Sequence, residues 1–411
     1  MLDPNQVREN PDLVRNNLKD RGGNSAVVDD FLMADSAWRE LTGEIEGLRA
    51  KKNKLGKEDQ EEARKIKEET KELEINLKPL EDRKEALLLQ IPNVPEERAP
   101  VGKDESENVV LREVGRAPKF KFEPKDYLTL AGGGIDVERA GKVSGSRFGY
   151  ILGDLALLEF ALVRFVFDKL DKYGFTPIVP PVLIKPEPMI GMGKSKFIAD
   201  DDAFFIEKDN LYLVGTAEDT IGSMYMGETL HEEILPLRFV GFSSAFRREA
   251  GSYGKDTRGI LRVHQFDKVE MFSFTKPEDS VAENDFLLKM QEEIMQSLKL
   301  PYRVVHLCTG DMGFSASNQF DVETWIPSEN KYRETHSCSN TTDFQSRGLG
   351  IKYKNSKGGG YVHTLNATGV AIGRMLIAIL ENNQDSKGKV KIPKVLQKYV
   401  GKKEIEKPKL P

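Results

Sequence analysis

The sequence has 411 residues, of which 39% are apolar and 31% are charged, so two or three folding units with a sizeable core and a strongly charged surface are expected. Its 61 Lys and Arg against 66 Asp and Glu give a formal net charge of −5, which excludes nucleic-acid binding through bulk positive charge alone. With only Cys308 and Cys338, no apolar run of about 18 residues and no signal-peptide pattern, the sequence predicts a cytoplasmic protein with no disulfide framework and no membrane partner.

The first 90 residues predict a long helical hairpin. Apolar residues recur at three- and four-residue spacing in two segments, approximately 29–55 and 60–89, and Gly56 between them is a helix-stop signal. Each helix would be about 40–45 Å long at 1.5 Å per residue, and Pro79 is expected to kink the second. The apolar seams comprise Trp38, Leu41, Ile45, Leu48 and Leu55, then Ala63, Ile66, Leu73, Leu77, Leu80, Leu87 and Ile91.

The hairpin has more than one interpretation at this stage. A dimerisation coiled coil is the more ordinary use of such seams. Basic residues near the tip could instead contact a phosphate backbone, although a solvated charged face explains them almost as well. These tip residues are Arg49, Lys51, Lys52, Lys54 and Lys57.

Composition changes near residue 100, which predicts an arm over 1–100, a Pro-rich linker at 91–108 and a second domain over 101–411. Within the second domain, strand-like runs follow one another without a helix in every connection, which favours an α+β fold with an antiparallel sheet and helices packed on it. Helices are expected over 152–173, 277–298 and 368–382, and the Lys-rich segment after Ser386 is expected to be a mobile tail. The strand-like runs are 211–214, 237–242, 268–274, 302–307, 319–326 and 362–365.

Glycine-based phosphate loops are excluded by spacing. GMGKSK at 191–196 has Pro188 where a P-loop needs its first Gly, and GSYGKDT at 251–257 has Glu249 in that position. No GxGxxG follows a strand and opens a helix. Any nucleotide must therefore be held by side chains, of which arginine is the best suited.

Residues 246–274 predict a long-looped antiparallel hairpin rich in charged side chains. Alternation places Arg247 and Glu249 on one face of its first strand, and Phe266, Lys268 and Glu270 on one face of its second. Arginine forks bind phosphate, carboxylates hold ammonium groups, and an aromatic face stacks on a base. An ordinary amphipathic hairpin with paired surface charges explains the same pattern equally well.

The run FRREAGSYGKDTRGILRVHQFDKVE resembles motif 2 of the class II aminoacyl-tRNA synthetases in their seryl form. Residues 173–183 resemble motif 1, with Pro181 as its interface proline, and 363–382 resemble motif 3. GTAED at 215–219 resembles the serine-binding loop, and 334–348 resemble the metal and ATP segment. The resemblance implies an antiparallel catalytic sheet flanked by helices, preceded by an antiparallel coiled-coil arm that grips tRNA.

For ATP, the resemblance implies two catalytic arginines: Arg247 on the α-phosphate and the attacking carboxylate, and Arg374 on the γ-phosphate. Glu334 and Ser337 would coordinate a Mg²⁺ ion that accompanies ATP, and no zinc is expected. A buried salt-bridge role for Arg374 is the ordinary alternative. The complete implied ATP set is Arg247, Arg248, Glu249, Val263, Phe266, Glu334, Thr335, His336, Ser337 and Arg374, with Arg258 as a further phosphate candidate.

For L-serine, the resemblance implies contacts with the α-ammonium from the 215–219 loop and contacts near the hydroxyl from the second strand of motif 2 and from motif 3. A site built to hydrogen-bond a hydroxyl rejects alanine because its polar groups would be left unpaired. The implied serine set is Thr216, Ala217, Glu218, Glu270, Asn366 and Thr368.

The resemblance therefore implies a homodimer, formed through the catalytic domains, that activates serine with ATP and charges tRNA(Ser) held by the arm. Activity on tRNA(Sec) stays open. The sequence departs from the family at Glu96, where many relatives have His, and at Pro79 in the arm. A ligase that charges a carrier protein and a non-catalytic coiled-coil scaffold are the alternatives; the arm argues against the first, and the presence of Arg247, Glu334 and Arg374 argues against the second.

Overall fold

The computed structural model describes residues 1–56, 58–251, 258–356 and 358–408. Lys57 and most of the 251–257 loop lie outside the described residues. The chain divides into two compact units, Met1–Val94 and Pro95–Pro411. None of the helices in the described ranges combines the length and hydropathy that a bilayer crossing needs.

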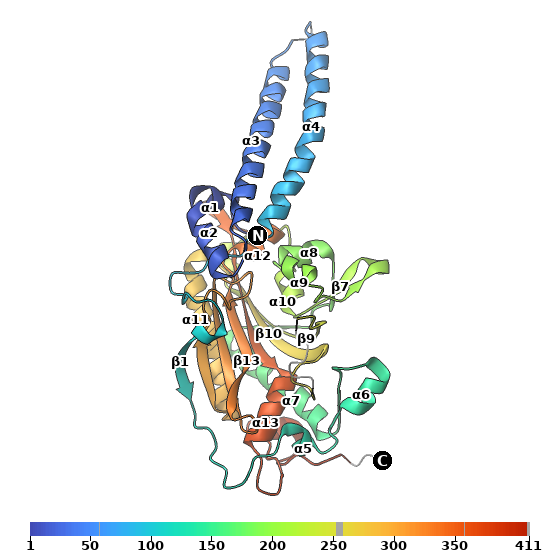
Figure 1. The fold of residues 1–411 in the computed structure, drawn as a ribbon, viewed down its shortest axis with the longest axis vertical. Helices are drawn as coiled ribbons and strands as arrows, with labels where there is room; N and C mark the ends of the chain where they lie inside the picture. Colours follow the sequence, from blue (N-terminus) through green and yellow to red (C-terminus); the bar gives the residue numbers. More distant parts are fainter. Residues whose placement is uncertain (57, 252–257, 357, 409–411) are drawn as a thin grey trace. The chain divides into compact units, whose positions relative to one another are not determined.

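The first unit contains the expected hairpin. Two short helices, α1 (Pro4–Glu9) and α2 (Pro11–Asp20), precede α3 (Ala26–Lys52) and α4 (Gln60–Leu88), which lie side by side in Figure 1. Ile45 and Ile66 are buried in the seam, and the Lys84 ammonium lies 3.2 Å from the centre of the Trp38 ring. The helix α4 continues through Pro79, so this proline does not end it.

The second unit is built on an eight-stranded sheet in the order β1-β11-β12-β13-β16-β10-β9-β4. Every neighbouring pair is antiparallel except β4 and β9, which are parallel. This confirms the α+β class with an antiparallel sheet. The strands are β1 (Val109–Val114), β4 (Thr176–Ile178), β9 (Leu237–Phe246), β10 (Gln265–Thr275), β11 (Tyr302–His306), β12 (Asn318–Ile326), β13 (Lys331–Asn340) and β16 (His363–Ala371).

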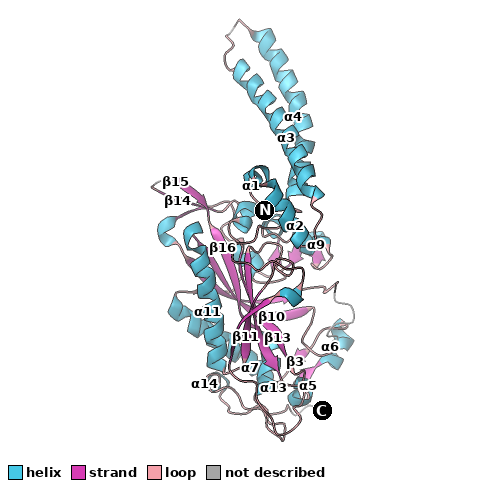
Figure 2. Ribbon diagram, turned by 60° about the vertical axis from the view of Figure 1, so that its left-hand side comes forward, coloured by secondary structure: helices cyan, strands magenta, loops and turns pink. Residues whose placement is uncertain are grey.

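Helices pack on the sheet to form the main core (Figure 2). The helices α7 (Asp154–Leu170), α11 (Ser280–Leu298) and α13 (Ile372–Asn382) contribute to one apolar cluster together with Val269 and Met271 of β10. Since side chains alternate along a strand, Lys268 and Glu270 face the opposite side of β10. The sheet therefore separates the apolar core from a polar face.

Smaller elements surround the sheet. A second apolar cluster joins Met192 and Ile221 to Phe272 and Phe274 of β10, and thus holds the 215–222 segment against the polar face of the sheet. The smaller helices are α5 (Tyr127–Ala131), α6 (Val137–Ser144), α8 (Pro186–Gly191), α9 (Ser195–Ala199), α10 (Glu218–Gly222), α12 (Phe344–Leu349) and α14 (Gln397–Val400). The smaller strands are β2 (Ile135–Asp136), β3 (Tyr150–Ile151), β5 (Leu183–Ile184), β6 (Phe205–Ile206), β7 (Leu211–Leu213), β8 (Thr229–His231), β14 (Lys352–Asn355) and β15 (Gly358–Tyr361).

Two expectations were wrong. The helix expected from residue 368 begins at Ile372, because residues 368–371 complete β16 between β10 and β13. The Lys-rich segment is packed rather than free through residue 408: Val390 and Leu396 are buried, and the Lys402 ammonium lies 2.9 Å from a carboxylate oxygen of Asp154.

Candidate active site

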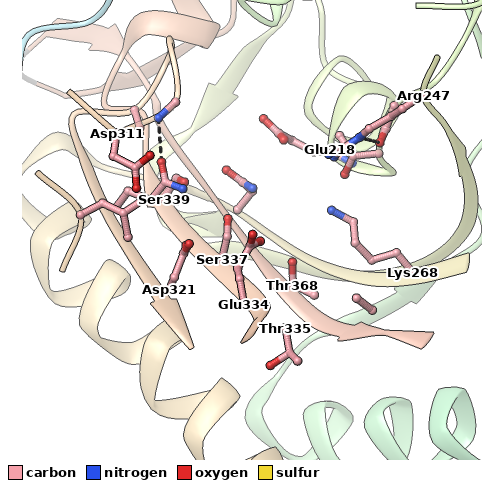
Figure 3. A pocket seen from close by; sticks show the side chains of 18 of the residues that line it. Glu218, Arg247, Lys268, Asp311, Asp321, Glu334, Thr335, Ser337, Ser339 and Thr368 are labelled. Atoms are coloured by element: carbon pink, nitrogen blue, oxygen red, sulfur yellow. Dashed lines mark hydrogen bonds between the residues drawn. The ribbon is translucent and has the colours of Figure 1, made fainter. Parts of the chain in front are cut away.

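The polar face of the sheet forms the floor of a cleft of about 1160 Å³. Side chains of β10, β13 and β16 line it, and the loop before α10 closes one side (Figure 3). The structure brings together most of the residues that the resemblance implies. Those that line the cleft are Thr216, Glu218, Arg247, Glu249, Val263, Phe266, Glu334, Thr335, Ser337, Asn366, Thr368 and Arg374.

Glu218 stands at the start of α10 as a buried, ionised acid. Its carboxylate accepts a hydrogen bond from Lys194 Nζ at 3.2 Å and another from Gln345 Nε2 at 2.7 Å. Burial alone would raise the pKa of Glu218, but the charges of Lys194 and Lys268 outweigh it and the pKa lies below its usual value. The neighbouring Asp219 shows the opposite shift: its burial outweighs the charge of Lys194, and its pKa is raised. Glu218 is thus a fixed negative charge suited to an ammonium group.

Glu270 is more completely buried than Glu218. Its side chain is fully buried, with one oxygen 2.6 Å from Lys268 Nζ and the other accepting from Asn366 Nδ2 at 3.2 Å. Asn366 and Lys268 line the cleft, whereas Glu270 does not. Lys268 and Asn366 therefore lie between the cleft and the Glu270 carboxylate, which both of them contact.

Arg247, at the end of β9, is oriented before any substrate arrives. Its Nε donates to the carbonyl oxygen of Gly215 at 3.2 Å, and its guanidinium lies 5.3 Å from the centre of the Phe266 ring. Glu249 follows with a φ of 55°, a left-handed conformation that non-glycine residues adopt rarely and mainly at functional sites. Its carboxylate forms a 2.6 Å ion pair with Arg262. This end of the cleft thus has two guanidinium groups and one aromatic face.

Arg374 enters the cleft from the first turn of α13. Its Nη1 lies 3.1 Å from a carboxylate oxygen of Glu334 and donates to the Glu334 carbonyl oxygen at 2.8 Å. Burial would raise the pKa of Glu334, but the Arg374 charge dominates and the pKa is lowered. Arg374 therefore forms a salt bridge, as the ordinary interpretation expects, and its position in the cleft wall also leaves it available to an anion.

The floor beside Glu334 has spare capacity to bind a cation. Ser337 and Asp321 face each other across β13 and β12, and both line the cleft. Burial, followed by the charge of Glu334, raises the pKa of Asp321 well above its usual value. Within the described residues, Asp321 Oδ1 has no hydrogen-bond partner. Acidic oxygens crowded together with an unused acceptor suit a hard divalent cation.

Four of the implied residues point away from the cleft or lie behind its surface. Glu270 lies behind the lining, as described above, and Ala217 is buried in the second apolar cluster. The Arg248 guanidinium lies 4.5 Å from the Phe204 ring and donates to the Ala203 carbonyl oxygen. His336 is packed on the other side of β13, where burial lowers its pKa to about 4. Arg258 does not line the cleft either.

The cleft lining also includes charged residues to which the sequence assigned no role, among them Lys194, Arg262, Lys268 and Asp321. Lys268 shares a strand face with Phe266 and Glu270, so alternation placed it correctly although no role was assigned to it. Lys194 lies in a false phosphate loop and is 24 residues from its acid partner, so no local pattern could pair them. Arg262 and Asp321 carried no signal that would separate them from ordinary surface charges.

Comparisons with known proteins cover the whole chain. Residues 203–383 match the family described as tRNA synthetase class II core domain (G, H, P, S and T), and residues 1–95 match the Seryl-tRNA synthetase N-terminal domain. A serine--tRNA ligase of Thermotoga neapolitana is 44% identical and is aligned over 98% of this chain and 99% of its own length.

Two solved structures share the fold at substantial identity. The seryl-tRNA synthetase of Pyrococcus horikoshii complexed with ATP has a TM-score of 0.93 and 39% identity, with full coverage of both chains. The cytoplasmic serine-tRNA ligase of Naegleria fowleri in complex with AMP has a TM-score of 0.88 and 34% identity, with 99% of each chain covered. By its sequence over the full length, its two matched domains and its fold, this chain belongs to the seryl-tRNA synthetases of class II.

Proposed function

We propose that this chain activates L-serine with ATP, forming seryl-adenylate as pyrophosphate leaves ATP, and then transfers serine from the adenylate to the 3′ end of tRNA(Ser). One observation supports the first half-reaction above all others. A single cleft is lined both by Arg247 and Arg374, which are suited to phosphate, and by Glu218, Asn366 and Thr368, the residues that the resemblance assigns to serine. The relatives at 44% and 39% identity carry the same activity in their names.

Adenylation at this site is mainly a matter of positioning and charge. The serine carboxylate is ionised at neutral pH, so it attacks the α-phosphorus without a general base. Glu218 would hold the ammonium group, and Arg247 would neutralise the charge that develops on the α-phosphate. Arg374 would hold the γ-phosphate, exchanging its contact with Glu334 for one with ATP. Phe266 would stack on the adenine, and Glu249 would accept from its amino group.

The floor of the cleft fits a Mg²⁺ ion bound with ATP. Glu334 and Ser337 would hold it, and the unused oxygen of Asp321 in the same cleft supports this assignment. Mg²⁺ in such sites takes one or two protein ligands and completes its shell with phosphates and water. When bound, the ion offsets phosphate charge as pyrophosphate leaves.

Serine-dependent exchange of labelled pyrophosphate into ATP tests this assignment. Exchange should require serine, with alanine and threonine weaker by factors on the order of 10² or more. Charging of purified tRNA(Ser), with tRNA(Sec) assayed in parallel, tests the second half-reaction. Exchange with alanine or threonine but not with serine would overturn the proposal.

The arm is proposed to bind tRNA. Its tip residues Arg49, Lys51, Lys52 and Lys54 are exposed, and exposed cations can neutralise a phosphate backbone. Deleting residues 30–90 should leave pyrophosphate exchange nearly intact and abolish charging. As the matched control, replacing only Lys51, Lys52 and Lys54 by Ala should raise the KM for tRNA and weaken its dependence on salt. If charging survived the deletion, the arm would not be the tRNA-binding element.

The second unit is proposed to form a homodimer. Large apolar side chains are exposed on α7 and around motif 1, among them Phe160 at 64% and Val179 at 78% exposure. Exposed apolar side chains of this size are typical of protein interfaces. Light scattering should give a particle of about twice the 46.3 kDa chain mass; a particle of single-chain mass at micromolar concentration would contradict the proposal.

A further inference from the structure

Lys268 is a nearly buried cation at the centre of the cleft. The residue is 8% exposed, and in Figure 3 its ammonium group points into the cavity between Glu218 and Thr368. Its Nζ lies 2.6 Å from Glu270 Oε2. The electrostatic influence of Lys268 also lowers the pKa values of Glu218 and Glu334. Lys268 therefore contacts or influences three acids of the site, yet the mechanism above assigns it no role.

Glu270 depends on this cation more than the other two acids do. It is fully buried, and an ionised carboxylate is stable in such a place only when a countercharge and hydrogen bonds offset its desolvation. Glu218 has Lys194 as a partner, and Glu334 has Arg374. In the described structure the ion pair of Glu270 is with Lys268 alone.

The surroundings of Glu270 offer little replacement for that charge. The paired residues on β9 and β16 are Gly241 and Thr368, and Asn366 of β16 donates a side-chain hydrogen bond to Glu270. From α10 comes Glu218, whose charge is balanced by Lys194. From β13 comes the Cys338 thiol, whose pKa burial raises, so it stays neutral. Among the described residues around Glu270, Lys268 is therefore the group that supplies a countercharge to this carboxylate.

We propose that Lys268 is a specificity-determining positioning residue, which keeps Glu270 an ionised acceptor aimed at the hydroxyl group of serine. The proposal rests on the proposed role of Glu270 in binding that hydroxyl. An ionised carboxylate can only accept hydrogen bonds, so a bound side chain without a hydroxyl leaves it short of a donor. A protonated carboxyl can donate to a neighbouring oxygen instead and no longer penalises alanine strongly.

Replacement of Lys268 by Met, which keeps the length and removes the charge, tests the proposal, with Lys268→Arg as the charge-preserving control. The measured quantity is the ratio of kcat/KM for serine to kcat/KM for alanine in pyrophosphate exchange. Lys268→Met should lower this ratio at least tenfold, mostly through the KM for serine, and Lys268→Arg should restore most of it. A melting curve and the KM for ATP show whether each variant is folded with its nucleotide site intact.

The pH profile supplies a second readout. In Lys268→Met the Glu270 carboxylate lacks its countercharge, so kcat/KM for serine should gain an acidic limb and rise with pH through the neutral range. The wild type and Lys268→Arg should lack this limb, and alanine activation should lack it in every variant. If Lys268 had only a structural role, its replacement would lower kcat/KM for serine and for alanine equally and would leave the pH dependence of both unchanged.

Glu270→Gln completes a double-mutant cycle, because Gln imitates the protonated carboxyl. If Lys268 acts through Glu270, adding Lys268→Met to Glu270→Gln should change the serine-to-alanine ratio by less than twofold. If instead the two substitutions lowered the serine-to-alanine ratio independently, so that their fold-losses multiplied in the double variant, the proposal would be overturned. Failure of the proposed function would give a different result, because the wild-type chain itself would then show no serine-dependent exchange. If Glu270 did not bind the hydroxyl, Glu270→Gln alone would leave the serine-to-alanine ratio unchanged.

Discussion

Replacing Arg247 by Ala should slow serine activation by roughly 10²–10³-fold. Contacts with the Gly215 carbonyl oxygen and the Phe266 ring hold this guanidinium in place, so little reorganisation is needed when the α-phosphate develops charge. Loss of one preorganised donor of this kind costs about 3–4 kcal/mol of transition-state stabilisation, which corresponds to that range of rates. The loss should appear in kcat as well as in kcat/KM, because the contact strengthens in the transition state.

The neighbouring residue provides a matched control. Arg248 carries the same charge one position along the chain, but its guanidinium contacts Phe204 and the Ala203 carbonyl oxygen outside the cleft lining. Arg248→Ala should therefore retain pyrophosphate exchange within a few-fold of the wild type. Equal losses in the two variants would refute the reasoning, as would an Arg247→Ala enzyme with unchanged turnover.

Two further predictions concern the acids Glu334 and Glu159. Glu334→Gln should raise the Mg²⁺ concentration needed for half-maximal exchange at least tenfold, and the binding of Mn²⁺ with ATP, followed by electron paramagnetic resonance, should weaken in parallel; unchanged binding would exclude Glu334 as a ligand. Burial, followed by the hydrogen bond and charge of Asp267, raises the pKa of Glu159 to about 8, so the folded state keeps a proton that the unfolded chain loses above about pH 4.5. The free energy of unfolding should therefore fall as pH rises from 5 to 8. The fall should be less than about 1.4 kcal/mol per pH unit, because Glu159 is partly solvent-screened. In urea titrations, Glu159→Gln should flatten this dependence of the unfolding free energy on pH.

Periodicity was sufficient to predict the elements whose partners lie near them in the chain. The heptad seams gave the arm helices to within about three residues, because Ile45 and Ile66 pack within one hairpin. The limit between β16 and α13 was misplaced by four residues, since the extended backbone through Ala371 is imposed by pairing with Lys268 on β10. That pairing joins residues about 100 positions apart and leaves no local signal.

The site likewise combines features that local sequence patterns predict with features that depend on residues distant in the chain. Alternation along β10 was enough to place Lys268 and Glu270 on one face, but the depth of Glu270 depends on Asn366 and on the segment packed by the second apolar cluster. The packed C-terminal segment was missed because its nine lysines mask the buried apolar positions Val390, Ile392 and Leu396. Net composition describes the surface of such a segment better than its fold.

The cleft is organised as a set of exchangeable ion pairs. Glu218 pairs with Lys194, Glu249 with Arg262, and Glu334 with Arg374, while Glu270 pairs with Lys268. Each acid thus has a cationic partner within the site, which offsets the cost of holding a carboxylate away from bulk water. ATP and serine bring both signs of charge, so binding can replace a protein partner by a substrate partner at each pair instead of desolvating a new ion. Arg374 illustrates the consequence: it can move to a phosphate only if Glu334 receives another cation, which makes nucleotide and divalent-cation binding interdependent.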